Sequence, residues 1–292
     1  MSIRLLVMGA SESNRRRPPS MGEQNNRLWA ERLQNTYSVH GYWPAILMHY
    51  INARATGDEL PTLEELQGFG KDMYMFDRSL IYRWSHADIW NIAMPANVAK
   101  AGLHYFEMHE QELVQYSPDV IILCLGSVDC LEHTPARTIQ DFNEIKSNQY
   151  LDHSQSTTFD YCDTAEEFHE VLSKLSEKAA KINKNATIIN IDILKAPNIS
   201  PRIVEKINSF SSVIRDISRD HGQHFISLSD IFDRDDYDEK IWFMSDRHPT
   251  ELMNKHIAMK VLDCIPFDRQ YKKIDNFPVK TLDIKLKIGD KT

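Results

Sequence analysis

Residues 4–14 read RLLVMGASESN, an apolar run that ends in two small residues and a serine. A short run of continuous apolar residues is typical of a strand that is covered on both faces of a parallel sheet. In open α/β sheets, ligands and chemistry collect at the carboxyl ends of such strands. This stretch therefore predicts a strand over residues 3–8 and puts the hydroxyl of Ser11 at the edge where these sheets carry their sites.

The rest of the chain alternates further apolar runs with helical patterns. We expect strands at residues 89–93, 120–125, 186–194 and 224–228. We expect helices at residues 26–53 (in two pieces joined at Trp43-Pro44), 98–116, 164–184, 201–221 and 249–262. Alternation of this kind predicts βαβ units and a mainly parallel sheet.

The predicted architecture is a three-layer α/β/α sandwich around a short, mainly parallel sheet. One domain is expected over residues 1–267, followed by a C-terminal extension over residues 268–292. A weak period of two at residues 281–286 makes that extension either an added edge strand or a contact arm. The polar segment 132–160 is expected to be a surface excursion or a lid.

Composition narrows the functional classes. The formal net charge of −8 over 292 residues argues against a general surface for nucleic acid or anionic membrane. No stretch reaches the roughly 18 apolar residues of a membrane span, and no signal peptide begins the chain. The four cysteines lack a C-x-x-C pair and are expected to be free thiols. We expect a cytoplasmic protein and leave its oligomeric state open.

A serine nucleophile needs a base, a group that orients the base, and donors for the oxyanion. His248, in the sequence SDRHP at residues 245–249, is the candidate base. Asp246 stands two residues before it and can orient the imidazole. Taken alone, a serine after a strand and a histidine before a proline are more often ordinary loop residues than a catalytic pair. No metal-ligand spacing and no phosphate-loop motif occurs, so we expect neither a metal nor a cofactor.

Four segments, taken in order, resemble the blocks of the SGNH (GDSL-type) hydrolase superfamily. They are GAS at residues 9–11, NIAMPAN at 91–97, GSVD at 126–129 and DRHP at 246–249. The resemblance implies an acyl-enzyme on Ser11, with His248 as base and Asp246 as its partner. It also implies oxyanion donors from the backbone N–H groups of Ser11 and Ala96, helped by the side chain of Asn97.

Four positions depart from the superfamily pattern. Ala96 holds the place of the glycine that normally supplies a backbone oxyanion donor. Alanine replaces the usual aspartate at residue 10, and Val128 stands where an asparagine would supply an oxyanion donor. Ser245 holds the usual place of the aspartate, three residues before the histidine, although related alginate-type acetyltransferases use the D-x-H spacing of Asp246. The G-x-V-D-C run, followed by P-x-R at residues 135–137, resembles a bacterial subset linked to surface polysaccharides.

The expected function is hydrolysis of an O-acyl ester, foremost an acetyl ester, on a carbohydrate or small metabolite. Arg15, Arg137 and Arg247 are expected to hold a substrate carboxylate or phosphate, unless they are only a solvated surface. Two alternatives stay open. One is acyl transfer to a sugar hydroxyl by the same site, and the other is a catalytically weak binding or scaffold protein on this fold.

Overall fold

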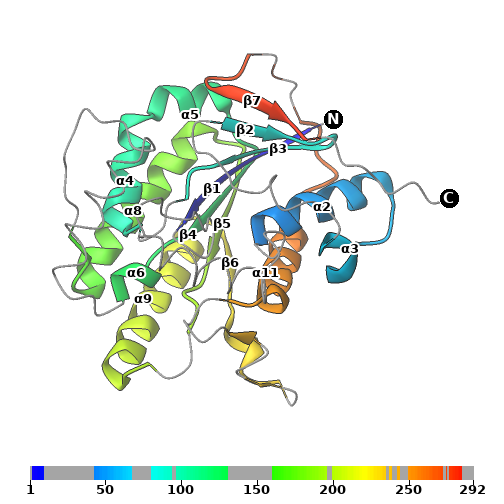
Figure 1. Cartoon of the computed structure of the whole chain (residues 1–292). Coiled ribbons are helices and arrows are strands. Elements are labelled where there is room, and N and C mark those ends of the chain that lie inside the picture. Colours follow the sequence, from blue (N-terminus) through cyan, green and yellow to red (C-terminus); the bar gives the residue numbers. More distant parts are fainter. Residues whose placement is uncertain are drawn as a thin grey trace, which may run out of the picture.

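The protein forms a seven-stranded sheet between two layers of helices (Figure 1). The computed structural model describes residues 2–9, 43–67, 80–93, 97–130, 160–195, 199–234, 237–238, 242–243, 249–271, 274 and 276–284. The strands are β1 (Ile3–Gly9), β2 (Leu80–Arg83), β3 (Ala87–Asn91), β4 (Val120–Cys124), β5 (Thr187–Ile191), β6 (His224–Ile226) and β7 (Lys280–Asp283). Their spatial order is β6-β5-β4-β1-β3-β2-β7, and every neighbouring pair is parallel except β2 with β3.

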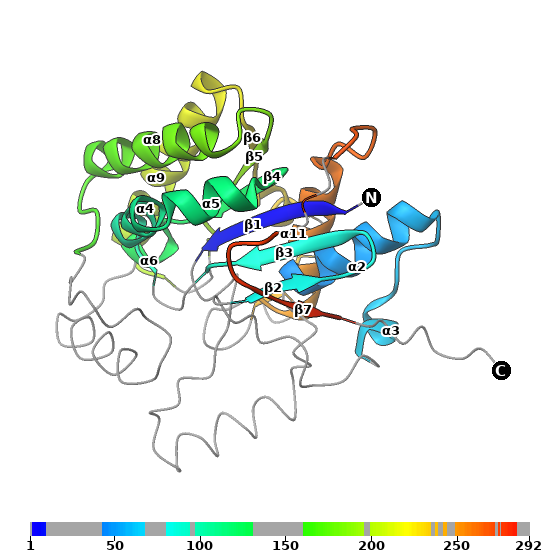
Figure 2. The same cartoon turned by 90° about the horizontal axis from the view of Figure 1, so that it is seen from above.

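The two helical layers cover opposite faces of the sheet (Figure 2). One layer contains α2 (Trp43–Thr56), α3 (Leu63–Gln67) and α11 (Glu251–Asp263). The other contains α4 (Ala99–Met108), α5 (Glu110–Tyr116), α6 (Ser127–Cys130), α8 (Ala165–Ile182) and α9 (Pro201–Asp220). The predicted three-layer α/β/α sandwich with a mainly parallel sheet is therefore confirmed.

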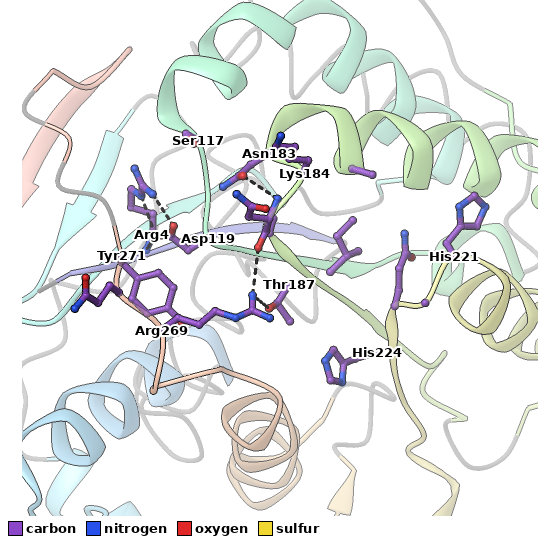
Figure 3. Close-up of a pocket in the computed structure, with 17 residues that line it drawn as sticks. Arg4, Ser117, Asp119, Asn183, Lys184, Thr187, His221, His224, Arg269 and Tyr271 are labelled. Atoms are coloured by element: carbon purple, nitrogen blue, oxygen red, sulfur yellow. Dashed lines mark hydrogen bonds and ion pairs between the residues drawn. The ribbon is translucent and has the colours of Figure 1, made fainter.

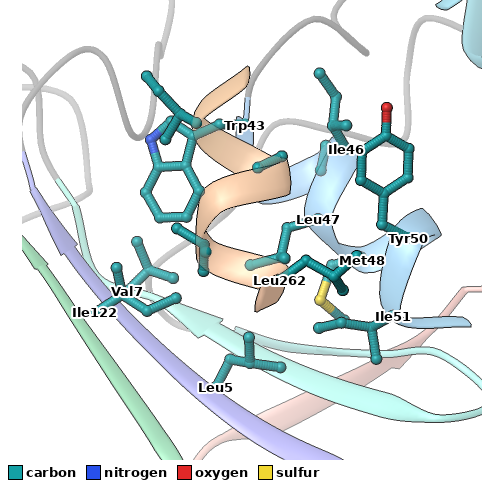
Figure 4. Packing of buried hydrophobic residues seen from close by; sticks show 14 of the residues in the cluster. Leu5, Val7, Trp43, Ile46, Leu47, Met48, Tyr50, Ile51, Ile122 and Leu262 are labelled. Carbon is teal, nitrogen blue, oxygen red and sulfur yellow. The ribbon is translucent and has the colours of Figure 1, made fainter. Parts of the chain in front are cut away.

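Strand β1 shows how the sequence produces these layers. All seven of its residues are buried. Leu5 and Val7 belong to the core cluster under α2 and α11, where Trp43 and Leu262 also pack (Figure 4). Leu6 and Met8 belong to the opposite cluster. Because side chains alternate between the faces of a strand, a strand buried on both faces is apolar along most of its length. The exception in β1 is Arg4, whose buried guanidinium is paired with Asp119.

Most predicted helices form where the pattern placed them. Helix α8 begins after Thr164, whose hydroxyl accepts a hydrogen bond from the Glu167 N–H at 3.2 Å. Helix α9 begins after Ser200, which caps it, and carries Pro201 in its first turn. Such caps satisfy N–H groups that have no partner inside the helix. None of the helices within the described residues is long and apolar enough to cross a membrane.

Two predictions need correction. The single helix expected over residues 98–116 is divided at His109, which lies outside helical geometry with φ −111° and ψ 21°. Strand β2 was not expected. It runs antiparallel to β3, and a tight turn joins the two strands, in which the Trp84 N–H donates to the Ala87 carbonyl at 2.8 Å. The first half of the helix expected at 26–53 and the segment 131–159 lie outside the described residues.

The C-terminal tail contributes an edge strand to the sheet. Strand β7 pairs in parallel with β2, so of the two alternatives for the tail the edge strand is confirmed. All four of its residues are exposed. The proposed division at residues 267 and 268 stays a prediction.

Candidate active site

Of the eight predicted site residues, the structure describes only Asn97. Ser11, Ala96, Arg15, Arg137, Asp246, Arg247 and His248 lie outside the described residues, so their roles stay predictions. Their neighbours in the sequence are described, however. These neighbours show how the described part of the carboxyl edge of the sheet is held together.

Asn97 connects the end of β1 to the segment before α4. Its side chain is buried, and its Nδ2 donates a hydrogen bond to the carbonyl of Gly9 at 3.2 Å. Gly9 is the last residue of β1 and lies two residues before Ser11. The buried Oδ1 of Asn97 has no hydrogen-bond partner within the described parts of the chain. One amide hydrogen is therefore used to tie two sequence blocks together, and the predicted use of the other at the oxyanion stays a prediction.

Asp129 performs a second connection, from α6 to the start of α4. Its carboxylate accepts hydrogen bonds from the N–H groups of Ala99 and Cys162, each at 3.0 Å. Val98, the residue before α4, provides no side-chain cap, so the helix receives its cap from Asp129 instead. An anion is favourable at a helix N-terminus because of the helix dipole. Burial raises the pKa of the Asp129 carboxyl, and the two backbone N–H groups act in the opposite direction.

Val128 occupies the position where the superfamily pattern has an asparagine. Its side chain is 5% exposed and packs in a small apolar cluster with Val98 and Ala101, against the half-buried Tyr161. A valine side chain has no hydrogen-bond donor. The described structure thus gives this position a packing role.

Gly126 makes the turn from β4 into α6. Its φ is +104°, and a Cβ placed there would lie 2.8 Å from Ile193 Cδ1 and 2.9 Å from Phe168 Cζ. Positive φ and close approach both favour glycine. The glycine of the third sequence block is thus required by the geometry of the turn.

The segment that contains the fourth sequence block is flanked by two residues that pair with each other. Phe243 and Pro249 form an isolated antiparallel bridge, and the Thr250 N–H donates to the Trp242 carbonyl at 3.1 Å. The chain segment that contains Asp246 and His248 therefore leaves and rejoins the fold at one place. Thr250 then caps α11 by accepting a hydrogen bond from the Met253 N–H.

These contacts bring three sequence blocks into one structural unit. Gly9 is paired with Cys124 in the sheet, Asn97 bonds to Gly9, and Asp129 bonds to Ala99. Sequence reasoning missed the bridging role of Asp129. The signal available in the sequence was an α4 start without a capping side chain of its own. Within the described part of the chain, no group of three or more His, Cys, Asp or Glu side chains is arranged to hold a metal ion.

Solved structures similar to this chain share its fold. A GDSL-like lipase from Parabacteroides merdae is 12% identical, with a TM-score of 0.54, over 90% of this chain and 95% of that one. A lipase/acylhydrolase from Enterococcus faecalis is 12% identical, with a TM-score of 0.51, over 90% and 94%. The acetylxylan esterase Axe2 from Geobacillus stearothermophilus is 15% identical, with a TM-score of 0.52, over 91% and 94%.

Family comparison gives the more specific result. No curated protein sequence matches the chain. The model of the GDSL-like Lipase/Acylhydrolase family matches residues 67–256, which is more than half of the chain, and supports a hydrolase. With the fold and the order of the sequence blocks in agreement, the chain belongs to the GDSL-like lipase/acylhydrolase family.

Proposed function

We propose that this hydrolase is a serine esterase that removes an O-acyl group, foremost acetyl, from a carbohydrate or small metabolite. Ser11 Oγ attacks the acyl carbon while His248 takes its proton, and Asp246 orients the imidazole. His248 returns the proton to the departing alcohol oxygen, leaving an acyl group on Ser11. Water, deprotonated by His248, then attacks the acyl carbon and releases the carboxylic acid together with free Ser11.

The observation that carries this proposal is the hydrogen bond from Asn97 to the carbonyl of Gly9. It fixes the strand end that precedes Ser11 against the segment that precedes α4. Ala96 is next to Asn97 in sequence, so this bond supports a common oxyanion site for the backbone N–H groups of Ser11 and Ala96. Oxyanion donors work because they are held in place before the charge develops.

Val128 predicts a slow enzyme of this kind. Loss of one oxyanion donor typically costs about 2.7–4 kcal/mol of barrier, or 10²–10³ in rate. The site would then operate on backbone donors, helped by the side-chain amide of Asn97. Formation of an acyl-enzyme should be easier to detect than rapid turnover.

The substrate class is part of the proposal. One neighbour is named an acetylxylan esterase, which makes an acetylated carbohydrate a reasonable first substrate to test. Arg15, Arg137 and Arg247 would suit a sugar that also carries a carboxylate or phosphate. All four cysteines are free thiols, which supports our further proposal of a reducing, cytoplasmic location.

Three protein samples test the nucleophile: wild type, Ser11→Ala, and the matched control Ser13→Ala. Each is treated with a fluorophosphonate, and the modified residue is located by mass spectrometry. Each is also assayed with p-nitrophenyl acetate. We expect labelling of Ser11 and turnover in wild type and Ser13→Ala, with both lost in Ser11→Ala. Equal labelling and equal turnover in all three samples would reject Ser11 as the nucleophile.

The same acyl-enzyme separates hydrolysis from transfer. After a brief exposure to p-nitrophenyl acetate, decay of the acetylated protein is followed by mass spectrometry in buffer and with added xylo-oligosaccharides. Hydrolysis predicts the same decay rate in both and no acetylated sugar. Faster decay together with acetylated sugar would replace the proposed esterase by an acyltransferase.

A further inference from the structure

A polar cavity of about 750 Å³ lies at the amino edge of the sheet, opposite the edge that ends in Gly9 and Asn97 (Figure 3). Arg4 near the start of β1 lines it, together with Asp119 just before β4, Thr187 at the start of β5 and His224 at the start of β6. Because these strands are parallel, their first residues meet at one edge. The cavity is thus separate from the predicted esterase site.

The only described carboxylate in the cavity lining is already neutralised. Asp119 accepts hydrogen bonds from Arg4 Nε at 2.9 Å and from Arg4 Nη2 at 2.6 Å, and both side chains are buried. Arg4 Nη1 is buried and has no hydrogen-bond partner among the residues that the structure describes. A buried N–H group without an acceptor is unfavourable, so this end of the cavity has unused donor capacity.

The remaining charged lining residues are cationic. Arg269 is held in place because its Nη1 donates to the Asn185 carbonyl at 3.2 Å and to Thr187 Oγ1 at 3.3 Å. Both of these side-chain hydrogen bonds use Nη1, and Lys184 lines the same cavity. This local excess of positive charge contrasts with the net charge of −8 of the whole chain.

The cavity is long as well as cationic. Strands β1, β4, β5 and β6 are consecutive neighbours, so Arg4 and His224 are three strand spacings apart, or about 14 Å at ~4.8 Å per spacing. Its volume is in the range of small-molecule sites. At the Arg4 end lies Tyr271, whose ring is held because its hydroxyl donates to the Pro266 carbonyl (Figure 3).

We propose that this cavity is a second ligand site, which binds an elongated organic phosphate. The phosphate would lie against the guanidinium of Arg269 and the ammonium of Lys184. The imidazoles of His221 and His224 add N–H donors on the same side of the cavity. Guanidinium and ammonium groups together are the usual protein ligands of phosphate. The organic part would extend toward Tyr271 and Arg4.

Some of these cations also have a role in the protein without ligand. Helices α8 and α9 end at this edge, and their C-terminal ends carry partial negative charge. His221 follows α9 directly and Lys184 lies two residues after α8, so their positive charge, where present, stabilises the helix ends. Stability of the free protein therefore cannot test the site, and the experiment has to measure ligand binding.

Isothermal titration calorimetry on the full chain provides that measurement. The probes are sodium pyrophosphate, adenosine 5′-diphosphate and glucose 1-phosphate, with sodium sulfate at matched ionic strength as the control anion. The variants are Arg269→Gln and Lys184→Gln. Arg215→Gln on α9 is the matched control, because it removes the same charge at an exposed position outside this cavity.

We expect saturable binding of at least one phosphate probe to one site, weakened about tenfold or more by Arg269→Gln and by Lys184→Gln. Arg215→Gln should change the affinity less than twofold. Tighter binding of adenosine 5′-diphosphate or glucose 1-phosphate than of pyrophosphate would show that the organic part also contacts the cavity. The proposal is overturned if no phosphate probe saturates, if sulfate binds equally well, or if all three variants bind like wild type. None of these outcomes depends on the esterase activity.

Discussion

Replacement of Gly126 by alanine should destabilise the protein more than replacement of Gly57 or Gly102. Gly126 has φ +104°, which is strained for any residue with a Cβ. The new Cβ would also meet Ile193 Cδ1 at 2.8 Å and Phe168 Cζ at 2.9 Å. Ile193 Cδ1 is the end of a flexible side chain and can move aside. Phe168 cannot move as easily, because its ring is stacked on Phe210 with the centroids 4.3 Å apart.

The magnitude follows from these two contributions. An unfavourable φ costs about 1–3 kcal/mol, and insertion of a methyl group into a packed core costs about 1–3 kcal/mol. Alanine also restricts the unfolded chain, which returns about 0.4–1 kcal/mol. Summed over these ranges, the free energy of unfolding should fall by about 1–5.6 kcal/mol.

Two other glycines separate the contributions. Gly57 has φ +78° but open space around its Cβ position, so Gly57→Ala should show only the backbone cost of about 1–2 kcal/mol. Gly102 lies inside α4, and a Cβ there would be 2.9 Å from Met8 Sδ. Gly102→Ala should show only the contact cost, reduced by the better helix propensity of alanine to about 0–2 kcal/mol.

Urea unfolding of the three variants, followed by tryptophan fluorescence and circular dichroism, provides the comparison. The slope of free energy against urea should be unchanged if only stability differs. If Gly126→Ala costs no more than Gly57→Ala, then the contact with Phe168 does not oppose the substitution and the reasoning is refuted.

Three further predictions concern other buried groups, and urea unfolding tests each of them. Asp119→Asn should lower the free energy of unfolding by about 3–5 kcal/mol, because the buried Arg4 loses its counter-charge. The double change Arg4→Met with Asp119→Leu should cost less, because it leaves no unpaired charge in the core. Burial raises the pKa of Tyr50 from 10 to about 12, because the ionised phenolate is unfavourable in the core. The free energy of unfolding should therefore be unaffected by this group below pH 10 and fall as the pH rises from 10 toward 12. Tyr50→Phe should abolish that alkaline loss and, because the buried hydroxyl has no described partner, cost nothing at pH 8. Asp129→Ala should lower stability by about 2–5 kcal/mol, because two buried N–H groups lose their acceptor, and unchanged stability would show that they find another.

The parallel core of the fold could be predicted because its strands have a simple physical signature. Strands β1 and β4 are buried on both faces, so each contains a continuous apolar run, residues 5–8 in β1 and 120–124 in β4. Strand β2 has no such signature. It is four residues long, and its parallel partner β7 lies about 200 residues later in the chain. Pairing over that separation leaves no local pattern in the sequence.

The break between α4 and α5 was not predictable for a related reason. Leu113 and Phe106 are both buried in the same core cluster, so the helical spacing of apolar residues continues across His109. Periodicity reports which residues face the core and does not report whether the backbone between them is regular. Sequence pattern was limited in the same way at the candidate site. The order of the sequence blocks indicated the edge of the sheet where the site lies, but it did not indicate the hydrogen bond between Asp129 and the Ala99 N–H. That bond depends on how α4 and α6 pack.

Val128 is better understood as part of that packing than as the mere loss of a catalytic amide. Its neighbours Val98 and Ala101 are themselves apolar and buried, and Ala101 belongs to the helix that Asp129 caps. An asparagine at position 128 alone would put an amide among these side chains, and a buried amide without partners is unfavourable by about 1–3 kcal/mol. A single substitution therefore does not recreate the superfamily's third block. The apolar cluster and the cap from Asp129 form one arrangement, in which the start of α4 is held by a buried carboxylate and Val128 packs against the same helix.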